Sequence, residues 1–329
     1  MNSIEVHTQH LLAKIFGVLI GHYTNHNVEE TDKLYDVSKR VINEDSIHDH
    51  YHKDFIYLYR KYGNYFFTKQ LYEKANYYLT KAERLIEDEF SMESAKFYYN
   101  ISIVKQRILE DKSLSLIYSK KALHIFEMNN FTMGIIKTMI TIAVQYHLMD
   151  RLEESLKYLN TAQERLEEKE RIDFQLQSSI EYNIGRVYQK MEDDELAIFH
   201  FEKAIDIIDS LEVKKDKIYS YNAMLEIYLK KKNWEKVDHY LSIALEIANI
   251  NNLSYLYVEL NGIKAQIYKS RGDELYYEKQ MKKTIDLALQ ESQTSLVTSL
   301  AEELANYYYE YRFYKKASDY YRISNGIIE

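Results

Sequence analysis

Apolar residues recur every three or four positions along almost the whole chain, in stretches of helical length separated by short polar turns. Turns of this kind stand at 128–130 and 249–252, where asparagines interrupt the apolar pattern. The clearest stretch, Ser178 to Ile205, has small residues at its positions 8, 20 and 27 and aromatic residues at positions 11 and 24. Two antiparallel helices approach closely only where side chains are small, and large rings fill the space between pairs. The pattern therefore predicts an all-α chain built from helical hairpins.

The same pattern recurs along the chain at nearly constant spacing. Its first position falls at Ile56, Lys96, Ile136, Ser178, Ile218, Val258 and Thr298, so successive offsets are 40, 40, 42, 40, 40 and 40 residues. Position 27 holds Ala82, Ala122, Ala162, Ala204, Ala244, Thr284 and Ser324, and position 11 holds Phe66, Gln106, Tyr146, Tyr188, Tyr228, Tyr268 and Tyr308. The pattern is strongest in repeats one and four and degenerates in two, five and six. A period of this length is typical of repeat proteins whose hairpins stack.

The arrangement of small and large residues is that of a tetratricopeptide repeat. The period exceeds the usual ~34 residues, and the chain has no proline to close each repeat, so we expect longer helices joined by polar turns. A single hairpin cannot bury its own apolar face, and stacking therefore produces one continuous core with a concave inner surface. The predicted fold is an all-α, right-handed superhelix of about seven tetratricopeptide-like helical hairpins at residues 53–329, with an N-terminal helical cap at residues 1–52.

The N-terminal residues lack the repeat pattern. They hold two stretches with helical periodicity, Ile4 to Tyr23 and Val28 to Ile42. These helices either cap the apolar end of the repeats or form a small docking module for a partner protein. We favour the cap, because covering an exposed apolar end requires no further assumption.

Composition narrows the classes of function. The 329 residues include no cysteine, which excludes disulfides, thiolate metal sites and thiol catalysis and suits a reducing, cytoplasmic location. The formal net charge is −8, whereas nucleic-acid binding by this chain alone would need a concentrated basic surface. No stretch approaches the ~20 apolar residues that span a bilayer, and the apolar segment 11–21 is interrupted by Lys14.

Motifs for chemistry are sparse. His48, Asp49, His50 and His52 are suitable metal ligands, but on a helix His50 would point away from the other two histidines, so we predict a solvated linker and no metal. The sequence has no glycine-rich phosphate loop, nucleophile elbow or HExxH motif, and we predict neither catalytic residues nor a cofactor. Most of the 33 tyrosines are assigned to packing, because they recur at position 11.

Positions 2, 5, 6, 9 and 12 of each first helix are predicted to line the inner groove. An asparagine there can donate to a peptide carbonyl and accept from a peptide N–H, while charged neighbours select side chains. A polar inner face is also what an unliganded solenoid presents to water, and this alternative stays open. The predicted peptide-binding residues are Asn100, Arg107, His147, Asn183, Arg186, Gln189, Tyr219, Asn222, Glu226, Glu259 and Gln266; Tyr57, Arg60, Asn64, Phe97 and Lys137 occupy the same positions.

Two pairs of segments carry a resemblance to a known family. They are 93–99 (ESAKFYY) with 119–126 (SKKALHIF), and 182–188 (YNIGRVY) with 193–204 (DDELAIFHFEKA). Both pairs resemble the tetratricopeptide-repeat peptide-pheromone receptors of Gram-positive bacteria, the Rap, NprR and PlcR-like proteins. The resemblance spans roughly residues 54–329. It implies a cytoplasmic regulatory receptor that binds a short signalling peptide in its groove, with Asn183 as the residue that clamps the peptide backbone.

The same resemblance leaves the downstream partner open. A receptor of this kind would switch its contacts with a partner protein, such as a response regulator, or with a second copy in a homodimer. Rap proteins dephosphorylate response regulators with a glutamine on a longer N-terminal bundle, whereas Gln9 is the glutamine in the residues before repeat one here. A Rap-like aspartate phosphatase is thus the first alternative, and a passive protein–protein interaction scaffold is the second. We find no N-terminal helix-turn-helix of the NprR and PlcR type.

Overall fold

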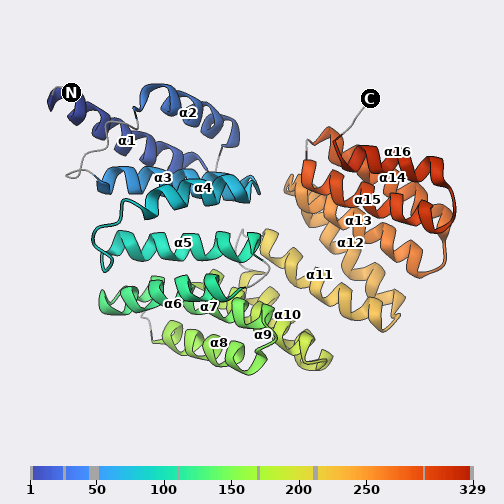
Figure 1. Ribbon diagram of the computed structural model, residues 1–329. Coiled ribbons are helices and arrows are strands. Elements are labelled where there is room, and N and C mark those ends of the chain that lie inside the picture. The colour runs from blue at the N-terminus through green and yellow to red at the C-terminus, as the bar shows by residue number, and fades with distance from the viewer. Residues whose placement is uncertain are drawn as a thin grey trace. The chain divides into compact units, whose positions relative to one another are not determined.

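The computed structural model describes residues 3–24, 27–43, 52–109, 112–168, 171–209, 214–291 and 293–326. Every regular element in these ranges is an α-helix, as predicted (Figure 1). The chain forms two compact units, Met1–Ile172 and Asp173–Glu329. The division falls between repeats three and four, where the repeat offset is 42 residues rather than 40.

Among the described residues, the first unit contains two N-terminal helices and three hairpins. The N-terminal helices are α1 (Ser3–Tyr23) and α2 (Val28–Val41). The hairpins are α3 (His52–Thr68) with α4 (Tyr72–Glu83), α5 (Met92–Ile108) with α6 (Ser113–Met128), and α7 (Thr132–Leu148) with α8 (Leu152–Glu167). Helix α1 packs against α2 and α3 and buries Ala13, Phe16 and Ile20 in the same core as the first hairpins. This packing is what a cap over the first hairpin requires.

The second unit contains four hairpins. They are α9 (Phe174–Lys190) with α10 (Asp194–Asp209), α11 (Lys214–Lys230) with α12 (Trp234–Ile250), α13 (Ser254–Ser270) with α14 (Glu274–Gln290), and α15 (Thr294–Glu310) with α16 (Tyr314–Ser324). In both units each predicted repeat start lies in the first helix of a hairpin. The two helices of each hairpin pack against each other, and each second helix also packs against the first helix of the next hairpin within its unit.

In the two strongest repeats the small residue at position 8 meets the large residue at position 24 inside the same hairpin, whereas the sequence predicted that position 24 fills the space between hairpins. A methyl carbon built on Gly185 would lie 2.7 Å from Cδ1 of Phe201, and one built on Gly63 would lie 2.7 Å from Cγ of Leu79. Both glycines occupy position 8, and both large residues occupy position 24. Contacts this short leave no room for a side chain. Glycine at position 8 therefore allows the two helices of the hairpin to pack closely.

Many of the tyrosines belong to a second repeated contact, between rings at positions 11 and 23. Nearly parallel stacks join Phe66 to Tyr78, Tyr188 to His200 and Tyr228 to Tyr240, with ring centroids 5.5, 5.4 and 5.6 Å apart. More tilted pairs join Tyr146 to Tyr158 and Tyr308 to Tyr320. Such pairs contribute about 0.5–1.5 kcal/mol beyond the burial of their surface. The assignment of the position 11 tyrosines to packing is confirmed for these rings.

The turns inside the hairpins share a backbone conformation. Position 15 has a positive φ in Gln70, Asp150, Glu192, Lys232, Gly272 and Arg312. In repeat four the N–H of Glu192 donates to the carbonyl of Gln189 at 3.1 Å, and the N–H of Asp193 donates to the carbonyl of Tyr188 at 3.0 Å. These bonds satisfy carbonyls at the end of α9, and they require the left-handed residue between the helices. The short polar turn thus replaces the proline that the repeats lack.

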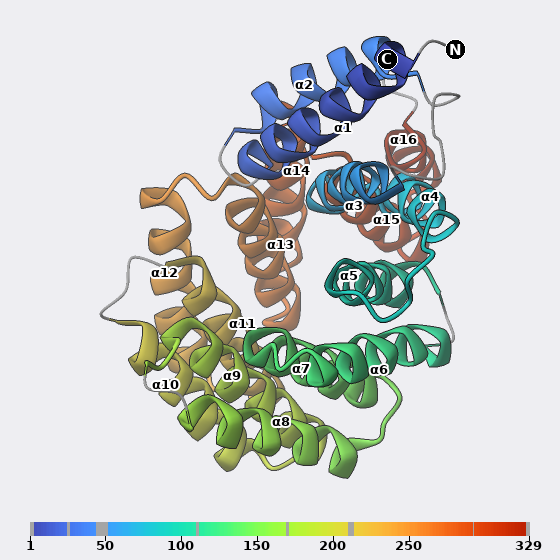
Figure 2. The ribbon, with the colours of Figure 1, turned by 90° about the vertical axis from the view of Figure 1, so that its left-hand side faces the viewer.

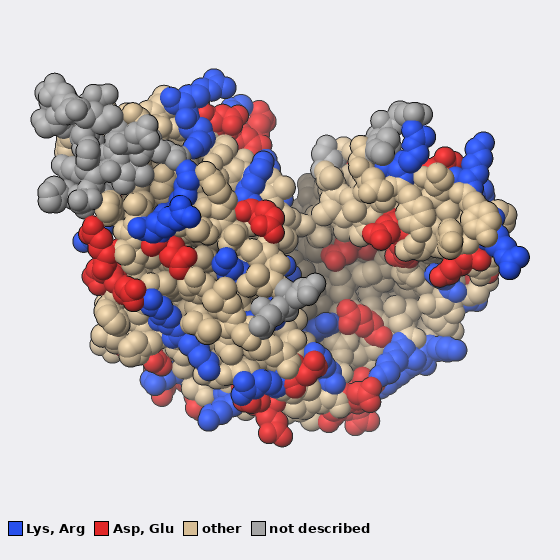
Figure 3. All heavy atoms as spheres, viewed as in Figure 1, with Lys and Arg blue, Asp and Glu red and all other residues tan. Residues whose placement is uncertain are grey.

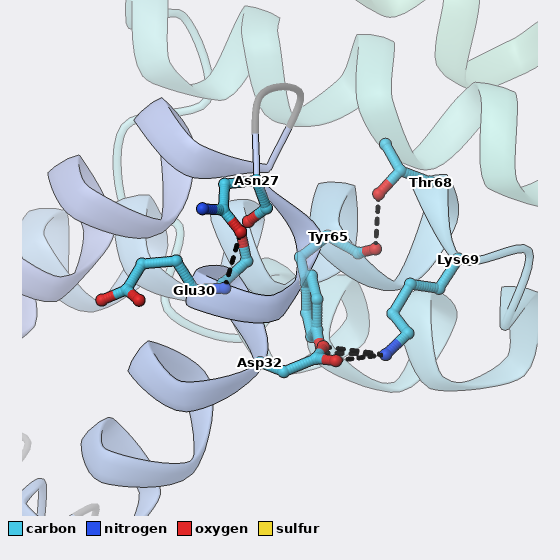
Figure 4. Close-up of polar contacts among 7 residues, drawn as sticks. Asn27, Glu30, Asp32, Tyr65, Thr68 and Lys69 are labelled. Carbon is cyan, nitrogen blue, oxygen red and sulfur yellow. Dashed lines mark hydrogen bonds and ion pairs between the residues drawn. The ribbon is translucent and has the colours of Figure 1, made fainter. Parts of the chain in front are cut away.

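Polar contacts join α2 to α3 (Figure 4). The Lys69 ammonium lies 2.8 Å from Oδ1 of Asp32, and the Tyr65 hydroxyl donates to the same oxygen. Burial raises the pKa of the Asp32 carboxyl, but the hydrogen bonds from Lys69 and Tyr65 outweigh that effect and hold the pKa below its usual value. At the start of α2 the side chain of Asn27 accepts a hydrogen bond from the N–H of Glu30 at 3.0 Å. Helix α2 is therefore held to the first hairpin by specific contacts.

Two surface properties bear on the classes of partner. Basic and acidic side chains are interspersed over the face shown in Figure 3. None of the helices in the described residues combines the length and apolar content that crossing a bilayer requires.

Candidate functional site

Each unit presents a surface made of first helices. Neighbouring first helices contact each other, α3 with α5 and α5 with α7 in the first unit, and α9 with α11 and α13 with α15 in the second. Figure 2 shows the first-unit helices following one another in this order. The predicted groove positions lie on these helices, so their side chains can meet across repeats.

Three of the predicted residues form one polar cluster on α9 and α11. Nη1 of Arg186 lies 2.8 Å from Oε2 of Glu226, and Nε2 of Gln189 lies 3.0 Å from the same oxygen. Arg186 and Glu226 both occupy position 9, one repeat apart. Their side chains are 33% and 57% exposed, and an ion pair this exposed contributes about 0–1 kcal/mol. A ligand could therefore replace the pair at little cost.

Tyr182 stands beside this cluster and was not singled out from the sequence. It is half-buried on α9, with its ring centroid 5.8 Å from that of Phe201 and 6.5 Å from that of Tyr219. Burial raises the pKa of the Tyr182 hydroxyl. The positive charge of Arg186 lowers this pKa, and the negative charges of Glu226 and Glu259 raise it. The signal for it in the sequence is its place at position 5, which is one of the predicted groove positions.

Glu259, on α13, is a half-buried carboxyl. Burial raises its pKa, because removal from water disfavours the charged form. No ion pair to Glu259 is found among the described residues. Its carboxylate also acts electrostatically on Tyr182. The second unit thus holds a carboxyl group that a positively charged ligand group would stabilise in its ionised form.

The two predicted asparagines of the second unit differ in which hydrogen-bonding groups already have partners. Nδ2 of Asn183 donates to the carbonyl of Ser179 in its own helix at 2.7 Å, which leaves the side-chain oxygen as its acceptor. The side-chain oxygen of Asn222 is buried and accepts no hydrogen bond from the described residues. A buried acceptor without a donor costs about 1–3 kcal/mol. An N–H from a ligand would relieve that cost, but the oxygen is covered in this structure, so a ligand must first displace the side chains that cover it.

The remaining predicted residues are distributed over both units. In the second unit Tyr219 is exposed and Gln266 is half-buried. In the first unit Nδ2 of Asn100 donates to Oδ1 of Asn64 at 2.6 Å, Arg107 is exposed near the end of α5, and His147 is half-buried near the end of α7. Among the predicted peptide-binding residues, the structure therefore joins Arg186, Gln189 and Glu226 by direct polar contacts, and Asn100 is joined to the groove residue Asn64.

Two groove positions are corrected, because their side chains are buried. Phe97 was placed on the inner surface because it occupies position 2, but its side chain has no exposed area and belongs to the core of the first unit. Arg60 is also buried, and its Nη2 lies 3.0 Å from Oε2 of Glu93. Phe97 therefore cannot contact a ligand without repacking the core.

The structure also locates residues of the candidate metal site and the candidate phosphatase glutamine. His48, Asp49 and His50 lie outside the described residues, whereas Nδ1 of His52 lies 3.0 Å from Oε1 of Glu87. Within the described ranges no group of three or more His, Cys, Asp or Glu side chains is arranged to hold a metal ion. Gln9 uses its amide locally: Nε2 donates to the carbonyl of Val41 at 3.3 Å, and Oε1 accepts from the N–H of Asn43 at 2.8 Å. These contacts tie the end of α2 to α1.

Comparison with known proteins agrees with the repeat pattern. Residues 134–210 match the tetratricopeptide repeat family. The chain is 27% identical over 269 residues to response regulator aspartate phosphatase A of Bacillus subtilis (strain 168), which covers 79% of this chain and 67% of the relative.

Solved structures share the fold. A Rap protein complexed with Competence and Sporulation Factor matches 99% of this chain and 87% of its own, with a TM-score of 0.70 and 18% identity. NprR in complex with its cognate peptide NprX matches 95% of this chain and 88% of its own, with a TM-score of 0.67 and 16% identity. The resemblance to the tetratricopeptide-repeat pheromone receptors is thereby confirmed.

Proposed function

We propose that this tetratricopeptide-repeat protein, a relative of a Rap phosphatase with the fold of Rap and NprR, is a regulatory receptor for a short linear peptide. The observation that carries the proposal is the cluster on α9 and α11, in which Arg186, Gln189 and Glu226 meet across neighbouring repeats beside Tyr182. Rap and NprR have both been solved with a peptide bound, which supports this class of ligand.

The amides supply the backbone recognition. An extended peptide presents alternating N–H and carbonyl groups, and neutral amides bind these without reading the side chains. The buried side-chain oxygen of Asn222 would accept one peptide N–H, and the oxygen of Asn183 another. One N–H of Asn183 already donates to its own helix, so its side-chain oxygen and its second N–H remain for the peptide backbone.

The carboxyl groups supply the preference for charge. Glu226 is mostly exposed and Glu259 is half-buried, and both act on Tyr182 at the same surface. A basic side chain or a free amino terminus placed there would meet two carboxylates. Such a ligand is attracted to this surface, and an acidic group at the same place is repelled. We therefore expect the peptide to carry a positive charge next to Glu259.

Signalling requires that the peptide bind two conformations unequally. Arg186 and Glu226 connect adjacent repeats through an ion pair that costs little to open. A peptide that takes over either partner would change the contact between α9 and α11. The resulting change in repeat packing is the proposed route to altered contacts with a partner protein or a second copy of the chain.

Titration calorimetry with short synthetic peptides tests the proposal. Glu226→Gln should weaken binding of a basic peptide by about tenfold, whereas Glu195→Gln, an exposed residue on α10, should leave it unchanged. Asn222→Ala should weaken binding regardless of peptide charge. Equal loss in the Glu195 and Glu226 variants, or binding by neither the unaltered protein nor the controls across the peptide set, would refute the proposal.

A second candidate function is dephosphorylation of a response regulator, favoured by the sequence relationship to response regulator aspartate phosphatase A. Gln9 is the candidate glutamine, although its side-chain nitrogen and its side-chain oxygen both form hydrogen bonds with the backbone at the end of α2. Phosphate release from phosphorylated receiver domains measures this activity. Acceleration that Gln9→Ala abolishes would establish it. A passive scaffold would instead bind a folded protein and no peptide.

A further inference from the structure

A cavity of about 290 Å³ lies in the first unit, between α1 and the first helices of the first two hairpins. Gly21 and Thr24 line it from α1, Lys61 and Asn64 from α3, and Asn100 from α5. Four of these side chains carry hydrogen-bond donors, one of them charged, and the Thr24 hydroxyl already donates to the carbonyl of Ile20. The predicted peptide-binding residue Asn100 is thus part of a defined cavity.

Lys61 approaches α1 closely. A methyl carbon built on Gly21 would lie 2.7 Å from its Nζ atom, so a larger residue at position 21 would displace the ammonium group from its present place. The same nitrogen lies 5.2 Å from the centroid of the Tyr57 ring. Burial lowers the pKa of Lys61, the positive charges of Arg60 and Lys96 lower it further, and only Glu93 opposes them. The ammonium group is held in a place where its charge is disfavoured.

The carboxylate nearest to this cluster is already occupied. Oε2 of Glu93 lies 3.0 Å from Nη2 of Arg60, and Oε1 of Glu93 lies 2.8 Å from Nζ of Lys96. Two cations therefore already pair with this carboxylate, and no ion pair to Lys61 is found among the described residues. A half-buried cation in this position is stabilised by an anion that the chain itself does not supply.

The two asparagines complete the donor set. Nδ2 of Asn100 donates to Oδ1 of Asn64 at 2.6 Å, which fixes the Asn64 amide with its own NH2 group as a donor at the cavity. One ammonium group and one neighbouring amide NH2 match the two oxygens of a carboxylate, which accepts hydrogen bonds at both.

We propose that this cavity binds a carboxylate group, held by Lys61 and Asn64. If the receptor function proposed above is correct, the carboxylate belongs to the peptide, either at its C-terminus or on an acidic side chain. Because Gly21 and Thr24 form one wall, a bound carboxylate contacts α1 as well as the repeats. Occupancy would therefore fix the cap helices against the first two hairpins, which gives α1 a part in ligand binding beyond covering the core.

The test uses three probes on the full chain: N-acetyl-trialanine with a free C-terminal carboxylate, the same peptide as a C-terminal amide, and N-acetylglutamate amide. The pKa of Lys61 is followed through its side-chain NMR signal, which is assigned by its loss in Lys61→Arg. A bound carboxylate should raise this pKa, because an opposite charge favours the ammonium form. The comparison of the free-acid peptide with its amide shows whether a C-terminal carboxylate binds. N-acetylglutamate amide shows whether a side-chain carboxylate binds.

Lys61→Met should weaken binding of the effective probe by about tenfold or more, whereas Lys53→Met, which removes an exposed charge on the same helix, should have no effect. Lys61→Met should melt no lower than the unaltered protein, because it removes a half-buried charge. Equal binding of the amide probe and both carboxylate probes, or an unchanged Lys61 pKa with every carboxylate, would overturn the proposal. If a carboxylate probe raises the Lys61 pKa but no longer peptide binds, this site is upheld and the receptor function is refuted. If longer peptides bind equally well to the unaltered protein and to Lys61→Met, the receptor function is upheld and this site is refuted.

Discussion

Replacing Gly185 by alanine tests the packing rule on which the repeat architecture depends. The added methyl carbon would lie 2.7 Å from both Cδ1 and Cε1 of Phe201 and 3.1 Å from the carbonyl oxygen of Ala197. Carbon atoms in contact prefer about 3.5–4.0 Å, so the methyl overlaps the ring by about 1 Å. Phe201 is fully buried, and the backbone oxygen of Ala197 blocks relief on the other side. The helices α9 and α10 must therefore move apart.

The magnitude follows from two opposing effects. Overpacking a core costs about 1–3 kcal/mol, and replacing glycine by alanine inside a helix returns about 1 kcal/mol. The overlap involves a ring and a backbone atom, both unable to yield, so we expect the upper half of the cost and a net loss of about 1–2 kcal/mol. For a unit of this size that corresponds to a melting temperature lower by about 3–6 °C.

Thermal unfolding followed by circular dichroism measures the change, and hydrogen exchange locates it in α9 and α10. Gly262→Ala is the matched control, because its methyl would meet only the terminal Cδ2 of Leu300, at 3.0 Å. There the helix-propensity gain should dominate, and the melting temperature should stay equal or rise. If Gly185→Ala melts no lower than Gly262→Ala, the close approach at position 8 does not control hairpin packing.

Three further substitutions address turns and buried charges. Lys232→Gly should raise the stability by about 1 kcal/mol, because Lys232 holds a left-handed φ of 53°; a lower melting temperature would contradict this. Burial raises the pKa of Glu181, but hydrogen bonds from His200 and Lys203 outweigh it and keep the pKa below normal. This carboxylate therefore stabilises the fold above its unfolded-state pKa of about 4.3 and loses that effect as the pH falls through its folded-state pKa; Glu181→Gln should lower stability at neutral pH and flatten the acid decline in urea titrations. Burial raises the pKa of Glu259, so the free energy of unfolding falls as the pH rises from the unfolded-state pKa to the folded-state pKa. Glu259→Gln should therefore be more stable than the unaltered protein above that pH window, and the two proteins should be equally stable below it.

The fold was predictable in detail because its signals are local. The predicted stretches Ile4 to Tyr23 and Val28 to Ile42 correspond to α1 and α2 within one residue at each end. Helical spacing of apolar residues identifies a helix wherever the core face is continuous, and the fixed offset of the repeats identifies their partners. Gly185 marks a close approach in the sequence, and the structure places Phe201 against it.

The site was less predictable, because a repeat position defines a helix face but not its depth. Phe97 occupies a groove position and yet is fully buried, since the packing of neighbouring helices decides how much of that face remains open. Tyr182 occupies another groove position and lies among the charged residues of the cluster. Helical periodicity places both rings on the same side of their helices. Whether such a ring is buried or exposed depends on how the neighbouring repeat packs against it.

The sequence by itself determined the helices, their order and their pairing into hairpins, because each depends on residues close together in the chain or on a constant spacing. The tertiary structure alone decided which side chains meet: Arg186 with Glu226, forty positions apart, and Lys61 with the wall that Gly21 provides. It also decided which groups already have partners, such as the Asn183 amide that donates to its own helix. Those outcomes depend on distances between helices and on competition for hydrogen-bond partners, and neither is encoded in the spacing of residues along the chain.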